Sequence, residues 1–427
     1  MLSQLGVIAV QIFDNAMVGQ LGALPLAAVS FGGTVFFILF ILITGVAMAL
    51  TPLVGEQFAQ GNKKIATIYF QNSFLIFTAV GILATAVQFA IIPLMYHLGQ
   101  PKEVVDMAIP YYEYLVWSVI PYMLFGCFKQ FLEGIGNTTA NMIIIISANL
   151  INIFFNWLLI YGNWGFPMME AAGAGLATLI SRICMPVFAF LAFIIYPKFR
   201  QYFKYFSLKN FSWEPIKSLI LIGFPISLQM FMEGSAFALT SIMMGWIGTI
   251  EIAANQIALT ISNCAFMIVI GLASATTIRI SHEYGRKNYK ELQKTATASF
   301  HMVLMWNAFT ALIFILLREQ IAGFFTTDEE VIRVASILFI FVAAFQFSDG
   351  LQSVAVGILR GVKDVKSIMV IAFFSYIVIN LPVGYIFAFV FDFGAGGLWI
   401  GFIFGLSIAA FLLISRFRRQ CRGRLKY

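Results

Sequence analysis

The sequence predicts an all-α membrane protein with about twelve transmembrane helices, arranged as two parallel, pseudo-symmetric six-helix bundles. Hydrophobic residues make up 61% of the 427 residues, charged residues make up only 11%, and the mean hydropathy is +0.91. A soluble domain carries about 25% charged residues, so most of this chain must contact lipid. An internal repeat and a series of apolar segments joined by short loops complete the evidence for this fold class.

The two halves of the chain resemble one another at a nearly fixed offset. With a shift of 226 residues, the segment from Met17 to Thr51 aligns with the segment from Met243 to Thr277. Identical pairs include Gly19 with Gly245, Gly22 with Gly248, Gly45 with Gly271 and Thr51 with Thr277. The match resumes at a shift of 227, where Glu103 aligns with Glu330 and Gly134 with Gly361. A repeat of this length in so apolar a chain indicates a transporter built from two similar membrane halves.

Twelve segments are long and apolar enough to span a bilayer, since a spanning helix needs about 20 such residues. We predict them at residues 1–21, 26–58, 65–95, 105–130, 141–162, 173–196, 217–247, 252–279, 296–317, 331–358, 367–390 and 396–415. Residues 1–197 then form an N-terminal six-helix bundle, residues 198–216 a cytoplasmic linker, and residues 217–427 a C-terminal six-helix bundle with a basic cytoplasmic tail. Because each half holds six spans, both halves enter the membrane from the same side, which makes the repeats parallel.

We expect the first span to be shortened at its cytoplasmic end. Pro225 precedes the centre of span seven, and a shift of 226 places its counterpart before Met1. On the helical rise of about 1.5 Å per residue, span one is then about two turns short. A mis-assigned start codon or a trimmed chain is the favoured explanation, and a short first helix shielded by its own bundle is the alternative.

The placement of charge predicts the orientation. Most of the 26 basic residues fall in the tail or in the loops after even-numbered spans: Lys63, Lys64, Lys198, Arg200, Lys204, Lys209, Lys217, Arg279, Arg286, Lys287, Lys290, Lys294, Arg360, Lys363, Lys366, Arg416, Arg418, Arg419, Arg422, Arg424 and Lys426. The opposite loops hold mainly acids: Glu170, Glu251, Asp328, Glu329, Glu330 and Asp392. The positive-inside rule therefore predicts a multi-pass protein of the inner (cytoplasmic) membrane with both termini in the cytoplasm. The net charge of +7 is thus a topology signal, and we expect no nucleic-acid partner.

Signals of catalysis are weak in this sequence. The three histidines form no His-Glu-x-x-His pair, and the four cysteines occur singly. There is no Walker lysine motif, so we expect transport to be secondary, driven by an ion gradient and not by ATP. We predict that the protein is not an enzyme and uses no cofactor.

Three acids inside apolar helices are the informative residues. Asp14 lies in span one, Glu233 near the middle of span seven and Asp349 near the middle of span ten. An ionisable group at mid-bilayer costs about 2.5–3.5 kcal/mol or more, and marks an ion or substrate pathway by default. The alternative is that each acid hydrogen-bonds neighbouring helices and only fixes their packing.

Polar side chains also occur in spans five and six. Asn149, Asn152 and Asn156 recur at spacings of three and four, which places them on one helix face. Such a stripe either joins helices by hydrogen bonds or forms part of an ion site, and the sequence leaves both possibilities open. Arg182, inside span six, has no partner that the sequence identifies.

The residues around these acids resemble the signatures of the multidrug and toxic compound extrusion (MATE) family, over essentially the whole chain. The matching segments are Gln11…Asp14-Asn15-Ala16-Met17-Val18-Gly19, Gly223-Phe224-Pro225 leading to Glu233, and Gln346-Phe347-Ser348-Asp349-Gly350…Leu359-Arg360-Gly361. The span-five pattern Asn152…Asn156-Trp157…Tyr161-Gly162 is similar to the NorM-type branch, whereas another branch tends to carry an acid at the position of Asn156.

The resemblance implies two bundles that open in alternation and exchange external Na⁺ or H⁺ for internal organic cations. It implies that Glu233 and Asp349 bind the coupling cation, including a possible Na⁺, and that Asp14, Asn152 and Asn156 form a relay or substrate site in the first bundle. Relatives with a described cation site often carry a tyrosine one turn before the span-ten acid, where this chain has Phe345. The expected partners are small organic cations and membrane lipid, and the expected state is a monomer.

Three alternatives stay open at this point. A major-facilitator transporter also has six plus six parallel spans, although the three acids fit that class poorly. A lipid-linked sugar flippase of a related fold is a second alternative, although a flippase tends to need a more cationic cavity. An intramembrane enzyme would require a catalytic pair, and the sequence presents none.

Overall fold

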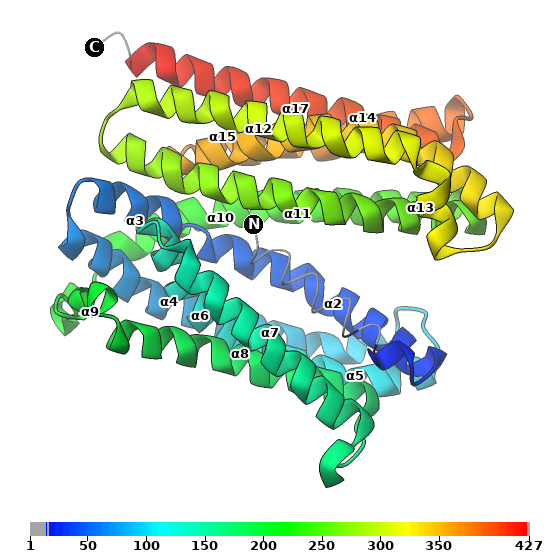
Figure 1. Ribbon diagram of the computed structural model, residues 1–427, viewed down its shortest axis with the longest axis horizontal. Helices are drawn as coiled ribbons and strands as arrows, with labels where there is room; N and C mark the ends of the chain where they lie inside the picture. The colour runs from blue at the N-terminus through cyan, green and yellow to red at the C-terminus, as the bar shows by residue number, and fades with distance from the viewer. Residues whose placement is uncertain (1–13, 15–16, 425–427) are drawn as a thin grey trace. The chain divides into compact units, whose positions relative to one another are not determined.

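The computed structural model describes Asp14 and residues 17–424. All regular secondary structure in that part of the chain is helical (Figure 1), as the sequence predicts. Eleven helical segments of the described chain are long and apolar enough to cross a membrane: Ala23–Ala59, Lys63–Met95, Lys102–Gly134, Thr138–Tyr161, Glu170–Ile195, Trp213–Ile247, Thr249–Gly285, Tyr289–Leu316, Glu329–Gly361, Val365–Val390 and Gly394–Cys421. They correspond to predicted spans two to twelve.

The first predicted span falls mostly outside the described residues. Asp14 and residues 17–19 are helical, and the chain then turns through residues 20–22 into the next helix. The expected shortening of this span concerns residues that lie outside the described range.

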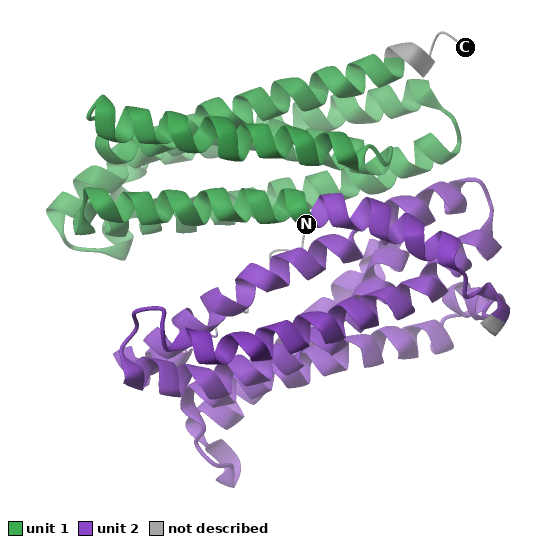
Figure 2. Cartoon of the chain, turned by 180° about the vertical axis from the view of Figure 1, so that it is seen from behind, with its two compact units in different colours: residues 1, 228–427 green, residues 2–227 purple. Residues whose placement is uncertain are grey.

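The chain divides into two compact units, one that ends at Ser227 and one that comprises residues 228–427 (Figure 2). The boundary falls inside the helix α10 (Trp213–Ile247). The first unit also holds α2 (Ala23–Ala47), α3 (Leu50–Ala59), α4 (Lys63–Met95), α5 (Lys102–Trp117), α6 (Val119–Gly134), α7 (Thr138–Tyr161), the 3₁₀ turn η1 (Asn163–Gly165), α8 (Glu170–Ile195), α9 (Pro197–Phe203) and the 3₁₀ turn η2 (Leu208–Asn210).

The second unit is built around α14 (Glu329–Gly361). This helix packs against α11 (Thr249–Gly285), α12 (Tyr289–Leu316) and α17 (Gly394–Arg424). The remaining elements are α13 (Arg318–Phe325), α15 (Val365–Ala372), the π-helix η3 (Phe373–Asn380), α16 (Leu381–Tyr385) and the π-helix η4 (Ile386–Val390). Because α14 contacts three long helices, a polar residue at its middle is enclosed by the unit.

Prolines explain three irregularities in the spanning helices. A proline ring clashes with the carbonyl four residues earlier and donates no backbone hydrogen bond. Pro52 thereby separates α2 from α3 near Met48, and Pro121 separates α5 from α6 at Ser118. Pro382 follows the π-helix η3, where the hydrogen-bonding register is widened.

The predicted linker contains short helices and is bound to the first unit. Gln71 of α4 donates to the carbonyl oxygen of Ser207 at 2.8 Å, and Asn72 donates to that of Asn210 at 2.9 Å. Both amide side chains are buried, so these bonds satisfy polar groups that would otherwise be costly inside the unit.

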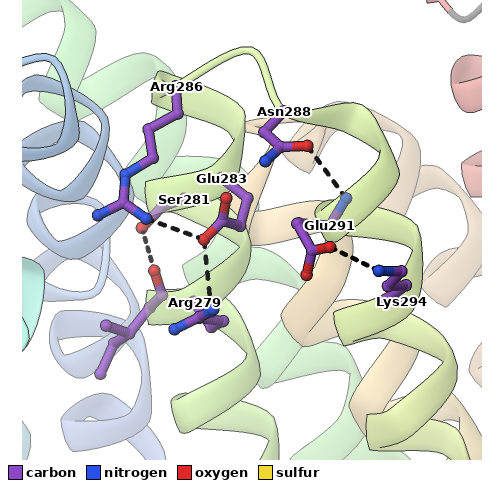
Figure 3. Close-up of polar contacts among 8 residues, drawn as sticks. Arg279, Ser281, Glu283, Arg286, Asn288, Glu291 and Lys294 are labelled. Carbon is purple, nitrogen blue, oxygen red and sulfur yellow. Dashed lines mark hydrogen bonds and ion pairs between the residues drawn. The ribbon is translucent and has the colours of Figure 1, made fainter.

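Figure 3 shows the turn between α11 and α12, where several of the predicted cytoplasmic charges lie. The Glu283 side chain, only 2% exposed, contacts Arg286 at 3.1 Å and Arg279 at 3.4 Å. Asn288 begins α12 by accepting a hydrogen bond of 3.2 Å from the backbone N–H of Glu291. The Glu291 carboxylate pairs with Lys294 at 2.7 Å, so acids partly compensate the basic residues of this turn.

The sequence repeat is also a structural repeat. Thr51 donates to the backbone carbonyl of Gln130 at 3.1 Å, and its counterpart Thr277 donates to that of Gly357 at 2.9 Å. Gln130 and Gly357 are related by the same shift of 227 that the sequence alignment requires. The two units therefore use one set of helix contacts twice, as expected for parallel repeats.

Candidate functional site

Glu233, on α10, belongs to a polar chain inside the second unit. Its Oε2 accepts a hydrogen bond of 2.7 Å from Gln229, one turn earlier on the same helix. The Gln229 side-chain oxygen in turn accepts a hydrogen bond of 2.6 Å from Nη2 of Arg360 on α14. The Gln229 amide thus bridges a carboxylate on α10 and a guanidinium on α14. The positions of both charged groups therefore depend on how these two helices pack.

Asp349 lies at the middle of α14 and is 5% exposed. It interacts electrostatically with Glu233, so the two acids that the sequence selected share one region of the second unit. Its Oδ1 atom is buried and accepts no hydrogen bond from the described residues. A carboxylate oxygen that lacks a donor in an apolar interior gains from a bound proton or cation.

The π-helix η3 supplies further polar atoms to the interior of this unit. The Tyr376 hydroxyl lies within hydrogen-bonding reach of the Glu233 carboxylate and interacts electrostatically with Asp349 and Arg360. This hydroxyl has no well-aligned hydrogen-bond partner within the described chain. The same holds for the buried Nδ2 of Asn380 and Oγ of Ser375. π-Helices occur frequently at functional sites, because the widened turn re-aims side chains.

A second polar cluster on α14 has a different environment. Gln346 and Asn307 of α12 exchange hydrogen bonds between side chains and backbone carbonyls at 2.7 and 3.1 Å. Thr310 adds a hydrogen bond of 2.7 Å to the Gln346 side chain. These three hydrogen bonds all join α12 to α14, so Gln346 serves helix packing.

The polar residues predicted for the first unit form a continuous chain. Asn156 donates a short hydrogen bond to Oδ1 of Asp14, and also donates to Asn152 at 3.1 Å. Asn152 donates to the Thr178 hydroxyl of α8 at 3.4 Å. The structure thus brings Asp14, Asn152 and Asn156 together. The spacing predicted the shared helix face of the two asparagines, and the family resemblance implied their association with Asp14.

Arg182, which the sequence left unexplained, has partners on α2, on α6 and at the junction between α5 and α6. Its guanidinium lies over the rings of Phe36, Phe40 and Tyr122 and donates a hydrogen bond of 2.8 Å to the Ser118 hydroxyl. These residues are far from Arg182 in the sequence, so no local pattern could have revealed the contact.

The described residues include no cluster of three or more histidine, cysteine, aspartate or glutamate side chains that could hold a metal ion. The interacting ionisable groups inside the second unit are two carboxylates, one guanidinium and one phenol, all within apolar helices. They belong to Glu233, Asp349, Arg360 and Tyr376. A polytopic helical protein with internal repeats that encloses interacting acids has the organisation of a membrane transporter.

Comparisons with known proteins identify the particular family. The sequence model of the MatE family matches residues 1–158 and 225–386. A probable multidrug resistance protein NorM of Idiomarina loihiensis is 34% identical over 439 residues, covering 99% of this chain and 92% of that protein. The corresponding NorM protein of Bacillus subtilis is 30% identical, covering 97% and 92%. The chain belongs to the MatE family, whose members are transporters and not enzymes.

Solved structures support the fold. The chain matches a crystal structure of MATE in the bent conformation with a TM-score of 0.90, at 22% identity, over 100% of this chain and 94% of that one. The family assignment removes the major-facilitator alternative, and it confirms the resemblance that the motifs around Asp14, Glu233 and Asp349 indicated.

Proposed function

We propose that the protein exports organic cationic or aromatic drugs and toxic compounds in exchange for Na⁺ or H⁺, by alternating access. The relatives that cover nearly the whole chain carry the name multidrug resistance protein NorM, which supports the substrate class. The two structurally repeated units support alternating access, because transporters of this construction move one repeat against the other around the bound substrate.

One observation carries the proposal: Glu233 and Asp349 interact inside a single unit, and Asp349 keeps an oxygen atom without a hydrogen-bond donor. In the outward-open state the acids bind H⁺ or Na⁺ from outside, and the neutralised site releases the cationic drug. In the inward-open state they lose the ion and attract the next drug molecule. Drug and coupling ion compete for the same negative charge, which gives the two states the difference in affinity that coupling requires.

Asp14, Asn152 and Asn156 form the relay or substrate site of the first unit in this scheme. Their hydrogen-bonded chain leads from Asp14 to Thr178 on α8, so a change of charge at Asp14 is transmitted to the packing of α7 and α8. The two units therefore carry different chemistry on similar scaffolds.

The protein acts in the inner membrane as a multi-pass monomer with both termini in the cytoplasm. The position of the basic loops supports this orientation, and the eleven described apolar helices support the multi-pass topology. No cofactor enters the scheme, because the ion gradient supplies the energy.

The proposal is tested with the purified protein in proteoliposomes. We expect a cationic dye loaded on one side to drive H⁺ or Na⁺ in the opposite direction, with no requirement for ATP. Dye movement that needs ATP and ignores both ion gradients would refute the scheme. The remaining alternative, a lipid-linked sugar flippase, predicts movement of a fluorescent polyprenyl-phosphate sugar between leaflets and no flux of dye.

A further inference from the structure

An aromatic cage surrounds a charged side chain in the first unit. The Arg182 guanidinium carbon lies 4.9 Å from the centroid of the Phe40 ring and 5.3 Å from the centroids of both Phe36 and Tyr122. A cation within about 6 Å of an aromatic centroid is attracted by the ring quadrupole, and three rings around one cation are the arrangement that recognises quaternary ammonium ligands. We define Phe36, Phe40 and Tyr122 as the cage.

The charge in the cage has a counter-charge within electrostatic reach but no direct ion pair. Asp14 and Arg182 interact electrostatically, yet the described residues show no ion pair between them. The Asp14 Oδ1 accepts from Asn156, and Arg182 donates to the Ser118 hydroxyl at 2.8 Å. The rings and a hydroxyl therefore hold Arg182 where it is, and Asp14 acts on it only through the electrostatic field.

The internal repeat relates this cage to the acid site of the second unit. The shift of 227 that relates Gly134 to Gly361 also relates Tyr122 to Asp349 and Ser118 to Phe345. A cage residue thus occupies in one unit the position that the acid occupies in the other. The two units present a cation-attracting group at equivalent places, in one case a ring and in the other a carboxylate.

We propose that Phe36, Phe40 and Tyr122, with Asp14 in electrostatic reach, bind the compact cationic head of a substrate, and that the Arg182 guanidinium is the built-in occupant that this head displaces. The substrate class is a guanidinium or small quaternary ammonium group. A guanidinium is planar and weakly hydrated, so it competes with such a group for the same rings. The proposal deepens the proposed function, because it names a substrate subsite in the first unit.

Because Arg182 competes for the cage, the apparent affinity for the substrate equals the intrinsic affinity multiplied by the fraction of time for which the cage is vacant. If Arg182 fills the cage for nine-tenths of the time or more, its removal raises the apparent affinity at least about tenfold. Arg182→Ala should therefore bind small cations more tightly than the wild type. If Arg182 had only a structural role in packing, its removal would give no such gain.

The experiment measures equilibrium binding of methylguanidinium and of tetramethylammonium to the full-length protein in detergent, by calorimetry and by thermal shift. We expect Arg182→Ala to bind both ions at least about tenfold more tightly than the wild type. The added change Phe40→Leu should abolish this gain, and the exposed Arg333→Ala should behave like the wild type. Arg182→Met, which keeps much of the side-chain volume, serves in place of Arg182→Ala if that variant does not fold.

Equal binding by the wild type and both Arg182 variants would overturn the proposal, as would a gain that survives Phe40→Leu. The readout needs no ion gradient, so it is separate from the test of transport. Glu233→Gln should lose coupled export yet keep cage binding if both proposals hold. Normal coupled export with no cage binding would leave the proposed function intact and remove this inference alone.

Discussion

Gln229 donates a hydrogen bond of 2.7 Å to Glu233 while its own oxygen accepts one of 2.6 Å from Arg360. The amide is therefore a positioning group between a candidate ion ligand and a basic side chain on another helix. The sequence showed Glu233 as an acid in an apolar helix, but it gave no reason to connect Gln229 with Arg360.

Gln229→Leu should disturb ion binding and leave the protein folded. A hydrogen bond to a charged group contributes about 1.5–3 kcal/mol, which corresponds to roughly tenfold or more in an equilibrium constant. Without its donor, the empty Glu233 carboxylate is less stable, so the coupling ion is held more tightly and released more slowly. The half-saturating ion concentration should fall about tenfold, together with the turnover rate, in a proteoliposome assay. The exposed Gln256→Leu is the control, and an unchanged ion dependence in Gln229→Leu would show that the amide only fills space.

Tyr376→Phe tests whether the Tyr376 hydroxyl binds the coupling ion or the side chain only contributes to packing. The buried Tyr376 hydroxyl approaches Glu233 but has no well-aligned hydrogen-bond partner in the described chain, so its loss should change the melting temperature little. If the hydroxyl binds the coupling ion, the half-saturating ion concentration should rise about tenfold, the equivalent of one hydrogen bond. Tyr385→Phe, at a largely exposed position of the same span, is the matched control. Wild-type ion affinity in Tyr376→Phe would exclude the phenol from the site.

Gly134 and Gly361 are related by the internal repeat, so replacing either one with alanine should destabilise the protein to a similar extent. A Cβ on Gly134 would lie 2.7 Å from Val54, and a Cβ on Gly361 would lie 2.7 Å from Ile280, the counterpart of Val54. Gly134→Ala and Gly361→Ala should each destabilise the protein by about 1–3 kcal/mol through overpacking, seen as a lower melting temperature in detergent. Gly33→Ala meets its nearest atom only at 3.7 Å and should be tolerated. A large effect at one of the two glycines alone would argue against equivalent packing.

The orientation is tested by labelling single cysteines with a membrane-impermeant maleimide. Cysteines at Lys204 and Lys290 should react only from the cytoplasmic side, and cysteines at Glu170 and Glu329 only from outside, because the basic loops are retained in the cytoplasm. Labelling of Lys290→Cys from outside would reverse the predicted topology.

This labelling requires a background with little reactivity of its own. Cys127 and Cys421 are buried, whereas Cys264 is exposed and Cys184 is half-buried. Replacing Cys184 and Cys264 with serine should therefore remove most of the background signal.

The parts of the fold and site that the sequence could predict follow from composition and periodicity. Long apolar segments are sufficient for the spans, and a carboxylate inside such a segment is conspicuous, so Glu233 and Asp349 could be selected before their electrostatic interaction was known. The stripe of Asn152 and Asn156 was visible because a helix places residues four apart on one face.

The remaining site residues depend on contacts between distant segments. Arg360 stands near Lys363 and Lys366, so it counted as a loop charge, but α14 continues to Gly361 and directs the side chain to Gln229. The position of Tyr376 depends on the π-helical register of η3, which its apolar neighbours do not reveal. These placements require tertiary structure.

The proposed function rests on the binding of the coupling ion by Glu233 and Asp349. Its most direct test measures dye-driven H⁺ and Na⁺ flux in proteoliposomes for the wild type, Glu233→Gln, Asp349→Asn and the exposed control Glu113→Gln. We expect both amide variants to insert and fold but to lose coupled flux, because each substitution removes charge and keeps volume, while Glu113→Gln keeps the wild-type rate. Wild-type flux in both Glu233→Gln and Asp349→Asn, with unchanged pH and sodium dependence, would contradict this expectation and make these acids packing residues.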